Sequence, residues 1–511
     1  MHFRRLACGA SIGVLLASLT VTNAPTSATS APAAWAYPNG DLANTRNATT
    51  STIDLANVAH LKKAWSFDLT GKATASVGGY GTLAANPIIQ NGVVYMQDLH
   101  SNVYALSLSS GHLLWEHTFN KPELSGPGPN GVAVANGTVY GETPDVAFAL
   151  DTRNGHLVWS DAHLLKKGQG TFGIQPQVSN GEVFLASQYG SAPGGGILVA
   201  LNASNGHELW SFKTMTGPEP GVQALGLGAG GAWETPLVSP GGTVTFGIGN
   251  PYQTVGEAYA QPARLLYSDS DVTLNASTGK LRWYYQGVEN DFKDFDMQAS
   301  PIATTVKGTP VVIGGGKMGD VYEMNASTGA LLWKTPVGIH NGDDNQSLAA
   351  LHHTGKLKLP FTFLPGSFGG ILTNMAYADN TIYAATINLP LRYTKDSQVT
   401  GQPLSGKFSY GGEMVALNAS TGAIEWSTTL KGIPDGAATV SNNLVFTALV
   451  SGRLIACNRT TGAIVLNMKL PRTMNSTLAI AGNTVIVPTG GPVSKGAKEK
   501  SQIVAYTVSP T

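Results

Sequence analysis

Apolar and polar residues alternate in short runs along most of this chain, and tight-turn residues separate the runs. The alternation predicts β-strands, and the Asn, Ser, Thr and Gly between the runs predict the turns that join them. One strand–turn–strand phrase recurs, as ALSLSSGHLLW, ALDTRNGHLVW, ALNASNGHELW, TLNASTGKLRW, EMNASTGALLW and ALNASTGAIEW, starting at residues 105, 149, 200, 273, 323 and 416. A seventh copy, ACNRTTGAIVL, starts at residue 456 and has Leu466 where the others have Trp.

A strand pair of this kind cannot bury its own apolar face, so the units must stack on one another. Successive repeat Trp residues are 44, 51, 73, 50 and 93 positions apart, and the short spacings match one four-stranded propeller blade of about 40–50 residues. We expect a single large all-β domain in which the repeat Trp residues pack between blades.

Two of the spacings, of 73 and 93 positions, are longer than one blade requires. The spacing of 73 must hold an extra loop, and that of 93 holds either a degenerate blade or a long insertion, for which residues 339–364 are the candidate. Residues 61–69 and 470–504 have the pattern of a first and of final strands. Their closure into one blade would leave no open sheet edge.

The N-terminus has the pattern of a secretory signal peptide, with Arg4 and Arg5 before an apolar stretch and small residues near residue 24. We predict a signal peptide over residues 1–24, a Pro/Ala/Ser/Thr linker over 25–38 and the propeller domain over 39–511; an uncleaved anchor is the alternative. The prediction is an exported protein, periplasmic or extracellular, that is not integral to the membrane.

Composition and the absence of certain motifs restrict the classes of function that the sequence supports. Charged residues are 12 % of the chain and the formal net charge is zero, so nothing favours nucleic acid as a partner. Beyond the leader Cys457 is the only cysteine, which leaves no internal disulfide and no C-x-x-C-H motif for covalent haem. No G-x-S-x-G elbow accompanies the His residues, so hydrolysis is unsupported. We expect a small-molecule ligand.

Several motifs outside the repeat occur in a fixed order. They are WAYPNGDLANTR at residue 35, GIGNP at 247, DFKDFD at 291 and GGGKMGDVYEMN at 314. Together with the repeat, they resemble the pyrroloquinoline quinone (PQQ)-dependent alcohol dehydrogenases, over almost the whole mature chain. The resemblance implies an eight-bladed β-propeller of four-stranded antiparallel blades, with PQQ and a metal ion, Ca²⁺ or a lanthanide, at the axis.

The resemblance also implies roles for individual residues. Trp233 would support the flat cofactor, Lys317 would lie near the quinone oxygens, and Asn250 would bind the metal. Asp294 would take the alcohol proton while hydride moves to PQQ, and would lie at the metal together with Asp296, whose offset matches a ligand of lanthanide-dependent members. Carboxylate and amide oxygens suit a hard cation, and a carboxylate suits the proton transfer. Electrons would leave to a separate acceptor such as a cytochrome.

The chain also departs from the family pattern. No Glu occurs in the loop of residues 187–197, where the family has a metal-binding Glu; Gln188 and Ser191 are nearest. The vicinal Cys pair is absent, Asn130 replaces an Arg, GGILT stands at 369–373 for G-G-x-N-W, and Lys293 replaces a Trp.

Three functions therefore remain open. The first is an alcohol-oxidising PQQ dehydrogenase, the second a non-catalytic propeller that serves as a binding or envelope-assembly scaffold, and the third a propeller that binds another ligand in the axial pocket.

Overall fold

The computed structural model shows the strands and turns that the repeat predicts. It describes residues 34–70, 81–121, 131–188, 190, 195–215, 217–218, 230–260, 265–289, 291–342, 359–404, 411–491 and 501–509. The predicted signal peptide and most of the predicted linker lie outside these residues. The described end of the linker packs on the domain, because Trp35 is 1 % exposed and exchanges two backbone hydrogen bonds with Ile89.

Eight antiparallel sheets of the same design make up the domain. The first four in chain order are β2 (Ile88–Gln90), β3 (Val93–Gln97), β4 (Val103–Ser107) and β5 (Leu113–His117); β6 (Ala133–Ala135), β7 (Thr138–Glu142), β8 (Ala147–Asp151) and β9 (Leu157–Asp161); β11 (Gln177–Ser179), β12 (Glu182–Gln188), β13 (Ile197–Asn202) and β14 (Glu208–Lys213), with β10 (Thr171–Phe172) added to β12; and β16 (Leu237–Ser239), β17 (Thr243–Ile248), β19 (Ser270–Asn275) and β20 (Leu281–Gln286).

The other four follow the same order. They are β21 (Ile302–Val306), β22 (Thr309–Gly315), β23 (Asp320–Asn325) and β24 (Leu331–Pro336); β26 (Ala376–Ala378), β27 (Thr381–Asn388), β30 (Gly411–Asn418) and β31 (Ile424–Leu430); β32 (Thr439–Ser441), β33 (Leu444–Leu449), β34 (Arg453–Asn458) and β35 (Ile464–Lys469); and β36 (Ala479–Ala481), β37 (Thr484–Thr489), β38 (Gln502–Thr507) and β1 (Lys62–Asp68).

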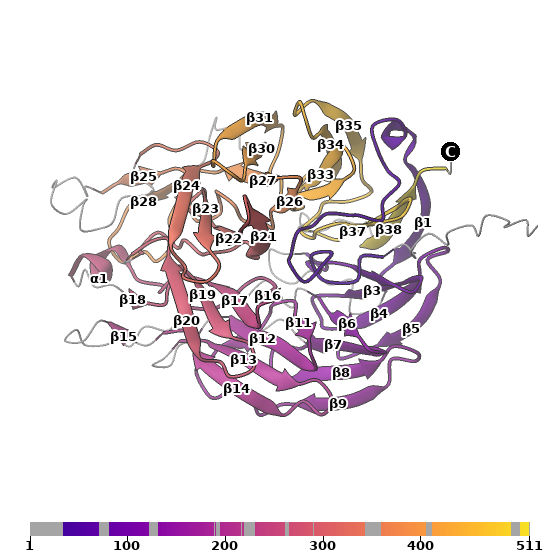
Figure 1. Cartoon of the computed structure of the whole chain (residues 1–511), viewed down its shortest axis with the longest axis horizontal. Helices are drawn as coiled ribbons and strands as arrows, with labels where there is room; N and C mark the ends of the chain where they lie inside the picture. Colours follow the sequence, from indigo (N-terminus) through magenta and orange to yellow (C-terminus); the bar gives the residue numbers. More distant parts are fainter. Residues whose placement is uncertain are drawn as a thin grey trace, which may run out of the picture. The chain divides into compact units, whose positions relative to one another are not determined.

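The sheets follow one another around a common centre in chain order (Figure 1). The first strand of each sheet lies nearest the centre (Figure 1), and first strands of neighbouring blades contact one another, as β2 does with β6 and with β36. The prediction of an eight-bladed propeller is confirmed.

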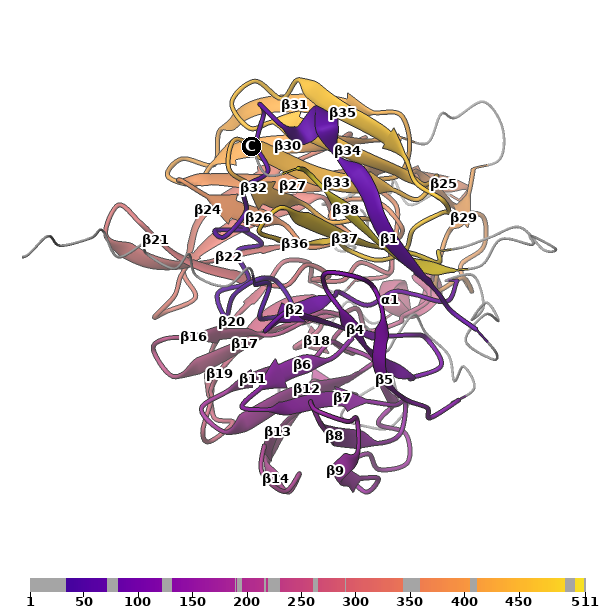
Figure 2. The same cartoon turned by 90° about the vertical axis from the view of Figure 1, so that its right-hand side faces the viewer.

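The ring closes through the two ends of the chain. β1 pairs antiparallel with β38, so Trp65 lies opposite Ala505 and the last blade takes its outer strand from the N-terminal region (Figure 2). The predicted closure is therefore confirmed. β38, the last strand of the chain, pairs with β37 on one side and with β1 on the other, so it presents no unpaired edge.

The repeat Trp residues hold neighbouring blades together, as predicted. Each indole Nε1 donates to a turn carbonyl of the next blade, from Trp115 to Thr152 O at 2.8 Å and from Trp210 to Ala276 O at 2.6 Å, for example. The turn Gly lies directly beneath the indole; a Cβ on Gly279 would lie 2.6 Å from Trp210, and its φ is +64°. Trp65, which the repeat does not include, makes the same contact with Leu108 O.

The two long spacings between repeat Trp residues, of 73 and 93 positions, are explained by insertions. Among the described residues neither spacing holds an additional blade. The first holds α1 (Val255–Ala260) and the two-stranded pair β15 (Gly217–Pro218) and β18 (Leu265–Leu266). The second holds a three-stranded sheet of β25 (Phe361–Phe363), β28 (Leu391–Tyr393) and β29 (Gln402–Pro403). The centre of the predicted insertion, residues 343–358, lies outside the described residues. No helix in the described part is long and apolar enough to cross a membrane.

An N-terminal strap, residues 34–60, crosses the inner strands of several blades and includes η1 (Val58–His60). Its backbone carbonyls accept hydrogen bonds from Ala303, Tyr377 and Val440, which belong to three successive blades. Arg46 of the strap is fully buried and donates to the carbonyls of Ala438 and Leu478. The strap therefore ties together several blades that are distant from it in sequence.

Candidate functional site

A cavity of about 310 Å³ lies where the loops before the inner strands converge. Blades starting at β2, β16, β21, β26, β32 and β36 each contribute residues immediately before the inner strand. The wall consists of Ala84, Asn86, Trp233, Glu234, Tyr252, Asp294, Asp296, Gln298, Lys317, Phe368, Leu372, Thr373, Thr400, Asp435, Asn475, Ser476 and Thr477. Four of the five predicted site residues are in this wall, and the fifth, Asn250, contacts two of them.

Asp294 is held by a hydrogen bond on each carboxylate oxygen. Asn250 Nδ2 donates to its Oδ1 at 2.8 Å, and Thr400 Oγ1 donates to its Oδ2 at 2.8 Å. The residue is 6 % exposed and has a φ of +58°, in the left-handed region that Asp tolerates better than most residues. The turn thus directs the Asp294 carboxylate at the cavity.

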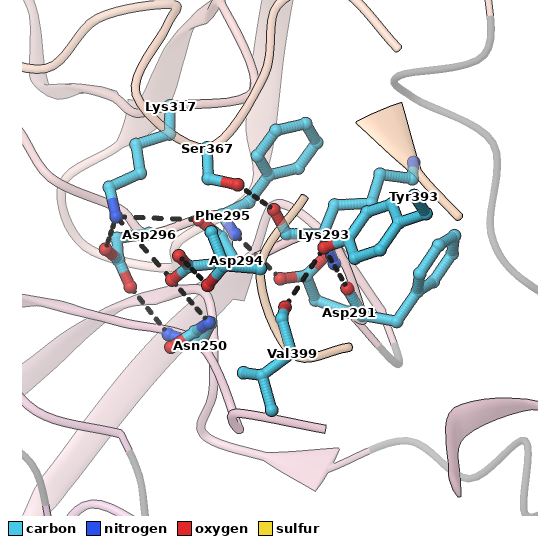
Figure 3. Close-up of polar contacts among 12 residues, drawn as sticks. Asn250, Asp291, Lys293, Asp294, Phe295, Asp296, Lys317, Ser367, Tyr393 and Val399 are labelled. Atoms are coloured by element: carbon cyan, nitrogen blue, oxygen red, sulfur yellow. Dashed lines mark hydrogen bonds and ion pairs between the residues drawn. The ribbon is translucent and has the colours of Figure 1, made fainter. Parts of the chain in front are cut away.

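Asp296 and Lys317 form a buried ion pair beside Asp294 (Figure 3). Lys317 Nζ also lies 3.8 Å from Asp294 Oδ1, and its backbone N–H donates to Asp296 O at 3.0 Å. Asn250 N–H donates to Asp296 Oδ1 at 2.8 Å. Gly249 makes this approach possible, because a Cβ there would lie 2.4 Å from the same oxygen.

The electrostatics of the site reflect burial. Burial raises the pKa of Asp294 to about 7, while the Lys317 ammonium and the Thr400 hydrogen bond lower it only in part. Burial also raises the pKa of Asp291 to about 6. Asp291 accepts backbone hydrogen bonds from Lys293 and Phe295, so it shapes the turn that presents Asp294 and is not itself part of the cavity wall.

Trp233 lines the cavity and is 5 % exposed. Its indole Nε1 packs close to Gly249, where a Cβ would lie 2.9 Å away. The GIGNP segment therefore brings the Trp233 ring, Asn250 and the Asp294–Asp296 turn together. A flat aromatic wall of this kind suits a flat ligand.

The oxygen donors fit a hard cation. Asn250 is 2 % exposed, and its side-chain Oδ1 is buried without a hydrogen-bond partner next to Asp294. An amide oxygen and two carboxylates are the ligands that Ca²⁺ and similar ions prefer. The described residues contain no group of three or more His, Cys, Asp or Glu that could hold a metal ion.

The departures from the family pattern have structural counterparts. Gln188 uses its side chain to donate to Gly173 O at 2.9 Å, and Ser191 and Asn130 lie outside the described residues. Lys293 is 1 % exposed, and its ammonium packs over Phe292 and Phe295 at 5.5 and 5.3 Å from the ring centres. It is absent from the cavity wall.

Sequence reasoning missed Thr400, Glu234 and Asp435. Glu234 Oε2 accepts a hydrogen bond from Asn374 Nδ2 at 2.9 Å, and Asn374 also donates to Asn39 of the N-terminal strap. The position of Glu234 directly after Trp233 was the one sequence signal that could have placed it in the site. Thr400 lies 106 positions after Asp294, and Asp435 lies further along the chain; no motif marks either residue.

Known proteins match the chain as follows. Residues 35–337 match the model of the glucose/ethanol/alcohol dehydrogenase PQQ β-propeller domain, and residues 410–509 match that of outer membrane protein assembly factor BamB. The dehydrogenase subunit of a quinone alcohol dehydrogenase from Gluconobacter oxydans is 27 % identical over 445 residues, which cover 76 % of this chain and 57 % of that protein. The quinoprotein alcohol dehydrogenase PedH of Pseudomonas putida is 28 % identical over 279 residues, covering 48 % of this chain and 45 % of that protein.

A solved europium-containing methanol dehydrogenase has the same fold, with a TM-score of 0.77, 20 % identity, and coverage of 94 % of this chain and 98 % of that one. The chain spans less than two thirds of the length of the two curated relatives. The family model nevertheless covers more than half of the chain, on the same residues that build the Trp233–Asp294–Lys317 site. The chain therefore belongs to the glucose/ethanol/alcohol dehydrogenase family of PQQ β-propellers.

Proposed function

We propose that this chain is an exported PQQ-dependent dehydrogenase that oxidises an alcohol. The observation that carries the proposal is the placement of Trp233, Asn250, Asp294 and Lys317 around one axial cavity. A scaffold would not need a buried carboxylate and a buried ammonium group directed into a cavity. Family membership and the alcohol dehydrogenases among the relatives support the same reaction class.

PQQ would supply the hydride acceptor, and Ca²⁺ or a lanthanide held by Asn250, Asp294 and Asp296 would supply a Lewis acid. Trp233 would support the flat ring system, and Lys317 would stabilise negative charge at the quinone oxygens. A separate protein such as a cytochrome would then take the electrons.

Asp294 would accept the hydroxyl proton of the alcohol. The hydrogen on carbon would leave with two electrons as hydride for the PQQ acceptor, so the products would be a carbonyl compound, the reduced cofactor and a protonated Asp294. Burial, which raises the pKa of Asp294 to about 7 without a bound cation, favours uptake of the proton, and a cation bound beside it would lower that pKa. Asn250 and Thr400 fix the carboxylate in position, so little reorganisation is needed when the proton transfers.

The test is reconstitution of the purified chain with PQQ and either Ca²⁺ or a lanthanide, followed by dye reduction with short alcohols. Asp294→Asn should lower kcat by about 10²–10⁴-fold, because it removes the base, and should leave PQQ uptake in place. Asp145→Asn, in an exposed Asp145–Lys121 ion pair, is the matched control and should retain activity. Full turnover by Asp294→Asn would reject Asp294 as the base.

A second candidate is a non-catalytic scaffold, and the BamB model match over residues 410–509 favours it. It predicts that neither metal promotes PQQ uptake. The absorbance spectrum of the protein mixed with PQQ and metal separates the two functions before any substrate is chosen.

A further inference from the structure

The cavity wall contains an acidic patch that the proposed reaction does not use, formed by Glu234, Asp435 and Ser476. The three residues precede the inner strands β16, β32 and β36, so they come from three blades. The negative charge of Asp435 raises the pKa of Glu234. Ser476 is 2 % exposed, and its hydroxyl has no hydrogen-bond partner. An unpartnered buried hydroxyl in a cavity wall is available to donate a hydrogen bond to a ligand or a water molecule in the cavity.

The charge of the wall is poorly matched to an anionic cofactor. The described wall has four carboxyl groups, on Glu234, Asp294, Asp296 and Asp435, and a single ammonium group, on Lys317. That ammonium already pairs with Asp296. PQQ has three carboxyl groups of its own, and ionised carboxylates repel one another in a buried site.

The acidic patch is nevertheless able to become neutral. Burial raises the pKa of both Glu234 and Asp435 to about 7. The hydrogen bond from Asn374 and the positive charge of Arg46 in the strap lower the pKa of Glu234 in part, and the charge of Asp435 raises it further. The pKa of Asp435 is raised by burial alone. Lys317, Asp294 and Asp296 are the other charged groups that line the same cavity.

We propose that Glu234 and Asp435 bind the carboxylates of PQQ as neutral carboxylic acids, so that the cofactor takes up protons as it enters the cavity. Each acid gains a proton from solvent, and its O–H donates to a cofactor carboxylate; the Ser476 hydroxyl adds a third donor. This inference rests on the proposed function. If Asn250, Asp294 and Lys317 hold the quinone end, the carboxylate-bearing remainder of PQQ must meet the rest of the wall.

The experiment measures the Kd of PQQ by quenching of Trp fluorescence at saturating Ca²⁺, from about pH 6 to about pH 9. Each proton taken up should raise Kd about tenfold per pH unit above the acids' pKa values. Calorimetry of binding in buffers of different ionisation enthalpy counts the protons directly.

Glu234→Gln combined with Asp435→Asn is the decisive variant, because amides stay neutral and still donate hydrogen bonds. It should bind PQQ as tightly as the unmodified chain at low pH, about 100-fold more tightly one pH unit above the pKa values of the two acids, and with a much flatter pH profile. Glu208→Gln, at an exposed position, should leave the profile unchanged. Titration of PQQ or of Asp294 affects every variant alike, so it cancels in this comparison.

Three results would overturn the inference. Uptake of PQQ without protons would reject it and leave the proposed function standing. Weaker binding by the amide variant at every pH would show that the acids act as anions, as they would for a cationic ligand. Absence of PQQ uptake at any pH would reject the proposed function itself. The proton count on the unmodified chain decides the question even if a variant fails to fold.

Discussion

Replacement of Lys317 by Met should destabilise the protein strongly, because Lys317 neutralises two buried carboxylates. The Lys317 side chain is 9 % exposed, that of Asp294 8 % and that of Asp296 0 %. Its ammonium pairs directly with Asp296 and lies 3.8 Å from Asp294 Oδ1. Met keeps most of the length and apolar volume of the side chain, so the change removes mainly charge.

The expected loss is about 3–5 kcal/mol in the free energy of unfolding, the range for removal of one partner from a buried ion pair. The desolvated Asp296 carboxylate, not the lost attraction alone, causes most of it. The double variant Lys317→Met/Asp296→Asn should therefore recover much of the loss. Added Ca²⁺ should restore part of the stability of Lys317→Met, if Asn250, Asp294 and Asp296 accept a cation.

Urea unfolding, followed by Trp fluorescence, measures these differences in the free energy of unfolding when the variants share the same dependence on urea concentration. Lys121→Met is the matched control, because Lys121 and Asp145 form an ion pair with side chains 32 % and 53 % exposed; it should cost about 0–1 kcal/mol. A loss below about 1 kcal/mol for Lys317→Met would show that the Asp294–Asp296 carboxylates do not depend on the ammonium group, and would refute this reasoning.

Two further predictions concern the scaffold. Gly181→Ala should cost about 1–2 kcal/mol, because φ is +80° and nothing lies within 4 Å, whereas Gly279→Ala should cost about 1–3 kcal/mol more through the clash with Trp210; equal urea midpoints would contradict the clash. Burial raises the pKa of Asp271, which is fully buried with both oxygens unpaired, to about 8. Its contribution to stability is present below about pH 4 and is lost as pH rises towards 8, by about 1.4 kcal/mol per unit. Asp271→Asn should therefore flatten the stability profile between these values, and an unchanged profile would show that Asp271 is not neutral in the fold.

The repeat made the fold predictable because it specifies contacts that recur. The turn Gly of one unit meets the Trp of the preceding unit across the blade boundary, as Gly155 meets Trp115, at every boundary except the one where Leu466 replaces Trp, so one phrase encodes both a hairpin and an interface. Trp65 makes the same contact outside the repeat, since its strand joins the blade of β36–β38 from the other end of the chain. Its role was not readable from the local pattern.

The site was predictable only where motifs mark it. Trp233, Asn250, Asp294, Asp296 and Lys317 were identified by family resemblance, and the structure brings them together; their chemical roles stay predictions. Thr400, Glu234 and Asp435 enter the same cavity through ring closure and an inserted loop. Contacts of that kind depend on the completed ring, so a single sequence gives no local signal for Thr400 and Asp435, and for Glu234 only its position beside Trp233.

Ring closure also has a consequence for how the chain is made. Gln502 of β38 donates to Asp68 of β1 across 434 positions in sequence. At about 5–20 residues per second, ribosomes need roughly 20–90 s to synthesise the residues between them. Throughout that interval β1 lacks its partner strand and Arg46 lacks the carbonyls of Ala438 and Leu478. Nascent or C-terminally truncated chains therefore present an unpaired strand edge, which makes them candidates for chaperone capture or aggregation before the last blade is complete.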